Sequence, residues 1–498
     1  MTAQDRAIDL VRFDNSYARL PERFFVRQAP TPVAKPRLIR INEPLAGKLG
    51  FDPEKLATPE GVECLAGNRL ARGAEPLAMA YAGHQFGSFV RQLGDGRAIL
   101  LGEVVDRDGA RRDIQLKGAG PTPFSRRGDG RAGLGPVLRE YLVSEAMAAL
   151  GIPTTRALAA VMTGEMIRRE KPLPGAVFVR VAASHIRIGT FQFFAARDDQ
   201  DGVRHLADHV IARHYSHVRD AANPYRALLD GVIARQAELV AKWLLVGFIH
   251  GVMNTDNMSI AGETIDYGPC AFMDAYHPAT VYSSIDEMGR YAYGNQPAIA
   301  QWNLARLAEA LLPLLADDKD AAIALAQEAL GAFAERFRAS YDAGLSRKLG
   351  VFQSRPGDSA LAQDLLDRMA RDGADFTLTF RRLADAAADR GADAQVRSLF
   401  SDPNDFDDWA ALWRVRLADD GGDAEARRTM MRANNPVYIP RNHLVEEAIA
   451  AAVDNNDFAL FGNLLAVLAT PYEEGPGLEH YAAPPRPDEI VHQTFCGT

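Results

Sequence analysis

Hydrophobic positions along this chain follow two different periods, and the change falls near residue 190. Before it, short apolar runs predict strands over 38–41, 113–117 and 176–181, with one helix that begins near Pro136 and ends before Gly151. After it, residues 231–250, 301–315, 320–341 and 443–453 carry apolar positions at helical spacing. We therefore expect an α+β protein with a β-rich N-terminal part and a mainly helical C-terminal part.

The run from Tyr81 to Val105 contains two apolar stretches joined by Gly94, Asp95, Gly96 and Arg97. Asp-Gly is a favoured hairpin turn, so the pattern predicts one β-hairpin over the whole run. The glycines Gly94 and Gly96 would let the backbone approach a ligand, and Arg97 would add charge. A plain surface turn is the alternative for this feature alone.

Length and composition limit the architecture and the function. A chain of 498 residues exceeds one ordinary core, so we expect a wrapping segment over 1–75, one lobe over 76–190 and a helical lobe over 191–498. The net charge of −9 argues against a general nucleic-acid binder. The sequence shows neither a signal peptide nor a run of 18 apolar residues, which predicts a cytoplasmic protein that does not enter a membrane.

Oxygen-bearing side chains gather between Phe248 and Gly268, in the sequence FIHGVMNTDNMSIAGETIDYG. We expect strands over 258–260 and 264–266 that pair across a turn and bring Asn257 beside Asp266. An amide oxygen and a carboxylate suit Mg²⁺ or Mn²⁺, which keep waters and nucleotide oxygens in their other positions. Asp256 would stand beside the metal, free for another role; the alternative is that it caps the hairpin or holds a metal-bound water.

Basic residues in the β-rich part predict a polyphosphate ligand. Lys117 ends a strand before a Gly-Ala-Gly break, and the helix that follows carries Glu140 where it can pair with that lysine. The intervening loop and the next strand add further candidates: Arg126, Arg127, Asp129, Gly130, Arg131, Arg180 and Arg187. Cations and flexible backbone together can close over a polyanion. A solvated loop and ordinary salt bridges are the alternatives for single residues.

The segment around His250 resembles the catalytic loop and metal-binding strand of the protein-kinase-like fold, in which an Asn is followed by an Asp-Phe-Gly triplet. Here the triplet is Asp266, Tyr267 and Gly268, and Val252 stands where kinases carry the catalytic Asp. Nearly the whole chain is similar to the selenoprotein O family. The similarity is carried by FDNSYARLPERFFVRQAPTPV, QLKGAGPTPFSRRGDGRAGLGPVLREYLVSEAM, HGVMNTDNMSI and the terminal FCGT.

This resemblance implies a bilobal kinase-like fold with a regulatory helix, a catalytic loop at 248–268 and a C-terminal helical extension. It implies a flipped ATP whose AMP moves to a Ser, Thr or Tyr hydroxyl of a protein, with Mg²⁺ or Mn²⁺; some members use UTP instead. By similarity, Asp256 accepts the proton, Asn257 and Asp266 bind the metal, and Lys117 contacts phosphate and pairs with Glu140. The other nucleotide contacts implied are Gly94, Gly96, Arg97, Asp129, Gly130, Arg180 and Arg187.

Two alternatives remain open at this stage: a phosphotransferase of the same fold, and a nucleotide-binding scaffold without activity. The three cysteines form no disulfide framework or zinc set. Family members place cysteine or selenocysteine at the C-terminus, so a Cys270–Cys496 disulfide is a further hypothesis. The acceptor proteins and the oligomeric state do not follow from the sequence.

Overall fold

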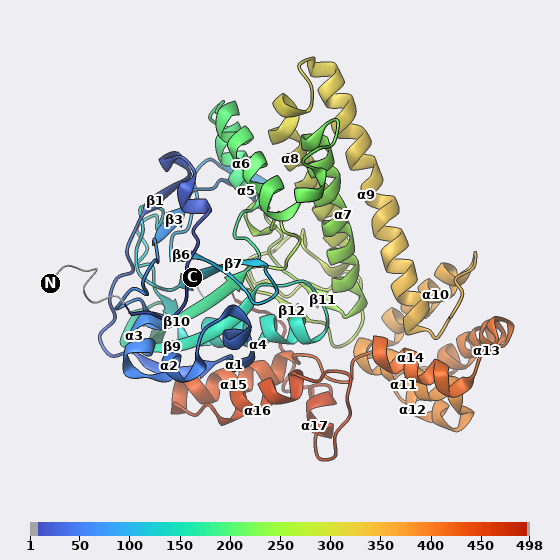
Figure 1. Ribbon diagram of the computed structural model, residues 1–498. Coiled ribbons are helices and arrows are strands. Elements are labelled where there is room, and N and C mark those ends of the chain that lie inside the picture. The colour runs from blue at the N-terminus through green and yellow to red at the C-terminus, as the bar shows by residue number, and fades with distance from the viewer. Residues whose placement is uncertain (1–7, 496–498) are drawn as a thin grey trace.

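The computed structural model describes residues 8–495, and its N-terminal half is built on one antiparallel sheet (Figure 1). The strands run in the spatial order β1, β3, β6, β7, β10, β9, β2, and β8 pairs with residues 175–176 of β10, on the same edge as β7. Their bounds are β1 Phe25–Arg27, β2 Arg37–Ile41, β3 Leu77–Met79, β6 Ala98–Val105, β7 Arg111–Lys117, β8 Ala132–Gly133, β9 Arg156–Arg168 and β10 Pro172–Ala182. The predicted wrapping segment thus supplies β1 and β2 to this sheet.

Helices cover both faces of the sheet. One face packs against α1 (Glu43–Leu49), α2 (Pro53–Ala57) and α3 (Pro59–Ala66). The other face packs against α4 (Leu134–Ala149), which is itself covered by α15 (Asn442–Asn455) and α16 (Ala459–Leu468) near the C-terminus (Figure 1). Chain segments about 300 residues apart therefore enclose the helix predicted from Pro136.

The side chains of β10 point alternately to the two faces of the sheet. Val177, Val179 and Val181 belong to the core under α1–α3, whereas Phe178 belongs to the core under α4. Successive strand residues point to opposite faces, so Arg180 shares the α4 face with Phe178. It is buried there, 1% exposed, and a buried guanidinium requires anionic partners.

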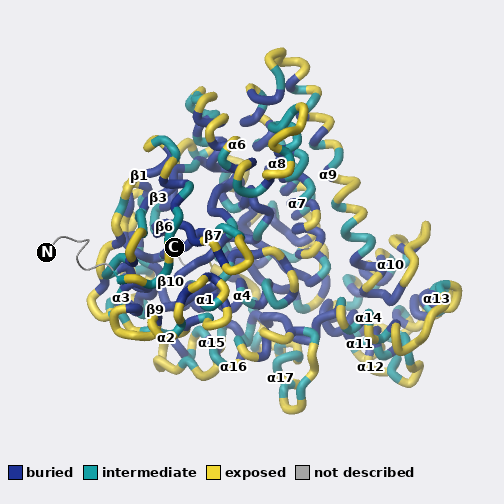
Figure 2. The backbone as a smooth tube through the Cα atoms, in the orientation of Figure 1, coloured by how far each residue is buried: buried dark blue, intermediate teal, exposed yellow. Residues whose placement is uncertain are grey.

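The second half of the chain is helical. Its central helices are α5 (Ile188–Ala195), α6 (Gln200–His214), α7 (Pro224–Leu245), α8 (Gln296–Leu315) and α9 (Lys319–Lys348). Helix α7 is buried along much of its length, whereas one side of α9 is exposed (Figure 2). The expected α+β arrangement, with a β-rich N-terminal and a helical C-terminal part, is confirmed. No helix among residues 8–495 combines the length and the apolarity that crossing a membrane requires.

A further helical unit follows α9. It contains α10 (Asp358–Asp372), α11 (Phe376–Ala388), α12 (Asp393–Arg397), α13 (Pro403–Asp420) and α14 (Ala424–Asn434), and α17 (Glu479–Ala482) comes after α16. Trp409 and Trp413 on α13 are fully buried, and their rings stack with centroids 5.3 Å apart. These helices therefore form a packed unit.

The hairpin predicted over 81–105 is wrong. A smaller hairpin, β4 (Gly83–Gln85) with β5 (Ser88–Val90), leaves the sheet, and residues 94–97 lead from it into β6. Strand β6 is already paired with β3 and β7, so it has no edge left for β5. Asp95 turns inward instead and accepts hydrogen bonds from the Met79 backbone N–H at 3.1 Å and Gln115 Nε2 at 3.3 Å.

We expect Lys348→Met to stabilise the fold in a pH-dependent way. Lys348 is 3% exposed, and burial lowers its pKa to about 7. The unfolded lysine keeps its proton to roughly pH 10.4, so the unfolded state binds more protons between these values and stability rises with pH. Urea unfolding should show a gain on the order of 3 kcal/mol at pH 7 that shrinks toward pH 10.

The exposed Lys319, at the start of the same helix, is the matched control: Lys319→Met should change stability little at any of these pH values. A gain for Lys348→Met that stays constant from pH 6 to roughly pH 10 would contradict a shifted lysine pKa.

Candidate functional site

One pocket of about 810 Å³ collects the predicted site residues. It lies where the sheet strands β7 and β10 face the loop that precedes β12 (Ala271–Phe272). Its lining includes Gly94, Gly96, Arg97, Lys117, Asp129, Gly130, Arg180, Arg187, Asp256, Asn257 and Asp266. Glu140 does not line the pocket but lies behind Lys117. Residues far apart in sequence therefore meet at one place.

The lining of this pocket is strongly basic. It carries nine cationic side chains, eight arginines and Lys117, against four aspartates, although the chain has a net charge of −9. Cations gathered in a concave site repel one another unless an anion compensates them. The pocket is therefore suited to a ligand with several negative charges.

Asp266 is the point on which the cations converge. Its Oδ1 accepts hydrogen bonds from Lys117 Nζ at 3.1 Å and Arg180 Nη1 at 2.6 Å, and its Oδ2 accepts one from Arg187 Nη1 at 2.7 Å. Burial alone would raise the pKa of Asp266, but these three charges hold the pKa well below its usual range. The backbone φ of Asp266 is +64°, a conformation that is uncommon for a non-glycine residue and concentrated at functional sites.

Glu140 holds Lys117 and Arg180 from the side of α4. Its Oε2 lies 2.6 Å from Lys117 Nζ, and its Oε1 lies 3.2 Å from Arg180 Nη1. The structure thus brings together the strand-end lysine and the helix glutamate that the sequence suggested as a pair. Glu140 and Asp266 thus hold the three cations in one network, and Asp95, 3.9 Å from Arg187 Nη2, adds a third carboxylate to it.

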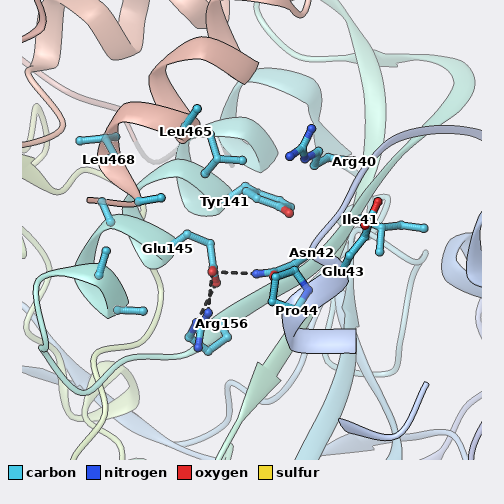
Figure 3. A pocket seen from close by; sticks show the side chains of 15 residues that line it. Arg40, Ile41, Asn42, Glu43, Pro44, Tyr141, Glu145, Arg156, Leu465 and Leu468 are labelled. Carbon is cyan, nitrogen blue, oxygen red and sulfur yellow. Dashed lines mark hydrogen bonds and ion pairs between the residues drawn. The ribbon is translucent and has the colours of Figure 1, made fainter. Parts of the chain in front are cut away.

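Another face of α4 is anchored beside a second pocket of about 500 Å³ (Figure 3). Glu145 accepts two hydrogen bonds from Arg156, at 2.9 and 2.7 Å, and one from Asn42 Nδ2 at 2.7 Å. From the pattern of apolar residues on this helix we expect Glu145 to be solvated. That prediction is wrong, because the side chain is only 12% exposed and fully paired. The anchor ties α4 to the start of β9 and to α1, and so sets the position of Glu140.

The hairpin predicted over 258–266 is also wrong. Ser259 forms an antiparallel bridge with Arg187, and Thr264 forms a parallel bridge with Thr154, so each half pairs with a different distant segment. The backbone groups that a hairpin would use are taken: Ile188 N–H donates to Met258 O, and Thr264 N–H donates to Pro153 O. This pairing lays Arg187 against the loop that carries Asp256.

Asp256 lies in a 3₁₀ turn, Thr255–Asn257, and is 6% exposed. Its Oδ2 accepts a hydrogen bond from Gln85 Nε2 at 3.1 Å, and its backbone oxygen accepts one from Arg187 Nη1 at 2.7 Å. Its Oδ1 is buried without a hydrogen-bond partner among the described residues. Burial raises the pKa of Asp256 to about 6, so the carboxyl is a better proton acceptor than a solvated aspartate.

Asn257 and Asp266 together fit part of a divalent cation site. Asn257 Nδ2 donates to Val252 O at 2.9 Å, which commits the amide nitrogen and leaves the amide oxygen for a cation. Within residues 8–495, no group of three or more His, Cys, Asp or Glu side chains could hold a metal by itself. A pair of oxygen ligands is what Mg²⁺ typically takes from a protein when substrate phosphates and waters complete its sphere.

The basic loop over 124–131 folds back on the residues that precede β6. A Cβ on Gly94, whose φ is +86°, would lie 2.4 Å from the Phe124 ring, and one on Gly130 would lie 2.0 Å from Gly120 O. Asp129 accepts hydrogen bonds from Arg169 at 2.8 and 3.1 Å. Gly94 therefore allows the two loops to pack against each other, Gly130 lets the basic loop close on its own start, and Asp129 fixes one arginine at the rim.

Two residues of the site escaped the sequence reasoning. Gln85, on β4, touches Asp256, and Asp95, 2% exposed, lies 3.9 Å from Arg187 Nη2. In the sequence, only the position of Asp95 between two glycines indicated that it could belong to the site. No sequence feature indicated this for Gln85. The proposed disulfide stays a hypothesis because Cys496 lies outside the described residues. The nearby Thr494 does donate a hydrogen bond to Pro269 O at 2.6 Å, next to Cys270.

A basic cleft that pairs a strand lysine with a helix glutamate, beside an amide and two aspartates, defines an enzyme site for transfer from a nucleoside polyphosphate. Comparison with known proteins identifies the family. Residues 8–469 match the family model described as protein adenylyltransferase SelO, and the chain belongs to this family.

Relatives described as protein nucleotidyltransferase YdiU match almost end to end. One from Bradyrhizobium diazoefficiens is 68% identical over 486 residues, which cover 98% of this chain and 99% of that relative. One from Methylorubrum extorquens is 68% identical over 495 residues, with the same coverage. One from Rhodopseudomonas palustris is 66% identical over 486 residues, again covering 98% of this chain and 99% of the relative.

Asp266→Asn should destabilise the ligand-free protein by about 3 kcal/mol, because it leaves three buried cations with too little negative charge. In metal-free buffer, inorganic tripolyphosphate should raise the thermal midpoint of this variant more than that of the wild type. Calorimetry with and without tripolyphosphate measures both effects.

Asp129→Asn is the matched control, since the Asp129 side chain is 44% exposed and its pairing with Arg169 should be worth about 1 kcal/mol or less. Equal losses in the two variants would contradict a central role for Asp266.

Proposed function

We propose that this protein is an adenylyltransferase with a kinase-like bilobal fold, which moves AMP from ATP to a Ser, Thr or Tyr hydroxyl of a protein and releases pyrophosphate. The observation that carries the proposal is the convergence of Lys117, Arg180 and Arg187 on Asp266. These cations lie deep in the pocket, so the outer phosphates of a flipped ATP would find compensation there. The α-phosphate would then face Asp256.

The metal ion belongs to the same arrangement. Asn257 and Asp266 would hold Mg²⁺ or Mn²⁺, which supplies positive charge to the phosphate oxygens when it is bound. Arg187 contacts both Asp266 and the backbone of Asp256, so it links the metal-binding residue to the proton acceptor. Arg126, Arg127 and Arg97 at the pocket lining would add charge around the leaving pyrophosphate.

Asp256 performs the proton step in this proposal. Its carboxylate takes the proton of the acceptor hydroxyl as the oxygen attacks the α-phosphorus. The new O–P bond forms as the bond from the α-phosphorus to the bridging oxygen breaks, and pyrophosphate leaves toward the cations. Val252, which lines the pocket, occupies the position of the usual kinase base and cannot accept a proton.

The position of the label decides between this reaction and phosphoryl transfer. With ATP labelled at the α-phosphate and Mg²⁺ or Mn²⁺, proteins of a host extract should become labelled, and with γ-labelled ATP they should not. Label from the γ position alone would make the enzyme a kinase, and label from neither position would favour a scaffold without activity. UTP labelled at the α-phosphate tests uridylyl transfer in the same assay.

Asp256→Ala and Asp266→Ala should fail in different ways. Asp256→Ala should lower the transfer rate by roughly 10² to 10⁴-fold with little loss of nucleotide affinity, because a base acts on the hydroxyl and does not bind polyphosphate. Asp266→Ala should weaken binding of the metal-nucleotide complex itself. Calorimetric titration with a non-hydrolysable nucleotide and Mg²⁺ measures affinity; equal losses of affinity would mean that these roles are wrong.

A further inference from the structure

Large apolar side chains are exposed on the hairpin and the loop that border the nucleotide pocket. Phe86 and Phe89 come from the β4–β5 hairpin and are 37% and 41% exposed; Ile285 and Met288 come from the loop before α8 and are 55% and 92% exposed. Phe89 pairs with His84 on the other face of the hairpin, with the two rings 4.8 Å apart. Phe86 and Ile285 line the pocket that contains Asp256, and we call these two residues the mouth patch. The patch therefore borders the place where an acceptor hydroxyl must arrive.

The hairpin and the loop are joined into one surface. The Phe86 backbone N–H donates to Asn254 Oδ1 at 3.1 Å and to Tyr291 Oη at 3.2 Å, and the Phe86 and Tyr291 rings lie 5.2 Å apart. The Arg290 guanidinium lies over both the Tyr291 ring and the Trp302 ring, at 5.7 and 4.9 Å from their centroids. Asn254 is two residues from Asp256, so the hairpin tip is fixed directly to the catalytic loop.

The backbone at the hairpin tip is strained in a way that singles out Phe86. The two turn residues, Phe86 and Gly87, have φ values of +51° and +85°, which is the turn type that favours Asn-Gly. Positive φ is unfavourable for a bulky side chain. Among the non-glycine residues with positive φ in the part of the chain described, Phe86 is the one hydrophobic residue. An aromatic side chain kept at such a cost, half-exposed and beside a catalytic carboxyl, indicates a function.

We propose that the mouth patch docks the acceptor polypeptide by receiving one large apolar side chain close in sequence to the modified hydroxyl. The occupant follows from the reaction: a hydroxyl that reaches Asp256 brings its flanking residues over Phe86 and Ile285. An extended chain advances about 3.3–3.6 Å per residue, and Phe86 and Ile285 line the same pocket as Asp256, so the apolar residue should lie within a few positions of the hydroxyl. This inference rests on the proposed protein-directed transfer.

Phe86→Asn tests the patch without endangering the fold, because Asn-Gly suits this turn and the backbone bond to Asn254 remains. The probe is an array of short peptides that carry one Ser, Thr or Tyr, with each flanking position changed in turn to Leu, Ser, Asp or Lys. Label is supplied as ATP labelled at the α-phosphate. Wild type should prefer Leu at one flanking position by about tenfold, the worth of one buried apolar side chain.

Phe86→Asn and Ile285→Ser should each raise KM for the preferred peptide by about tenfold, with kcat and nucleotide affinity within about twofold of wild type. Val415→Ser is the matched control, because Val415 is 70% exposed on α13, away from the sheet (Figure 1). It should leave KM unchanged. An unchanged thermal midpoint in Phe86→Asn shows that the hairpin is intact.

The possible failures are distinguishable. Wild-type labelling of peptides without an apolar preference, or an unchanged KM in Phe86→Asn, overturns the docking surface and leaves the proposed reaction standing. Absence of α-label on every peptide and every extract protein overturns the proposed function and the docking surface with it. A dimer in light scattering that dissociates in Phe86→Asn also overturns the proposal, since the patch would then bind a second copy of the chain.

Discussion

The structure depends on one partly buried carboxylate, Asp266, which lets cations from separate elements share a small volume. Lys117 ends β7, Arg180 lies within β10, and Arg187 precedes α5; each contacts Asp266 at 3.1 Å or less. Without that carboxylate, the sheet and the loop over 250–268 would meet at a cluster of like charges in a medium that screens them poorly. The pocket lining as a whole still carries nine cationic side chains against four aspartates. Polyphosphate binding is therefore favoured by the same electrostatics that hold the two halves together.

The arrangement of the sheet explains how these cations reach one point. Strand alternation turns Arg180 toward α4 while its neighbours Val179 and Val181 enter the core under α1–α3. Helix α4 then provides Glu140 at one face, and Glu145 fastens another face to Arg156 and Asn42. Since the position of Glu140 decides where the Lys117 ammonium points, packing on the far face of α4 contributes to the geometry of the site.

Local patterns predicted the elements that hold the site, but not how distant segments pair. The helix from Pro136, the strand that ends at Lys117 and the approach of Glu140 all depend on neighbouring residues and follow from periodicity. The pairing of residues 258–266 does not, because their partners lie about 70 and 110 residues earlier in the chain. A hairpin between them would have been the local solution. The distant segments satisfy the backbone N–H and C=O groups that such a hairpin would have paired. They also bring Arg187 onto the loop.

The position of Asp256 follows from what surrounds the loop that carries it. His84 N–H donates to Thr255 Oγ1 at 2.7 Å and Gln85 reaches Asp256, while from the other side Asn303 Nδ2 on α8 donates to Met253 O at 2.8 Å. A loop held from both sides keeps its carboxylate in place, so the proposed proton transfer would need little reorganisation. Val252, by contrast, has an apolar side chain that lines the pocket. The proposed base therefore stands four residues after position 252, where Gln85 of the β4–β5 hairpin holds its carboxylate.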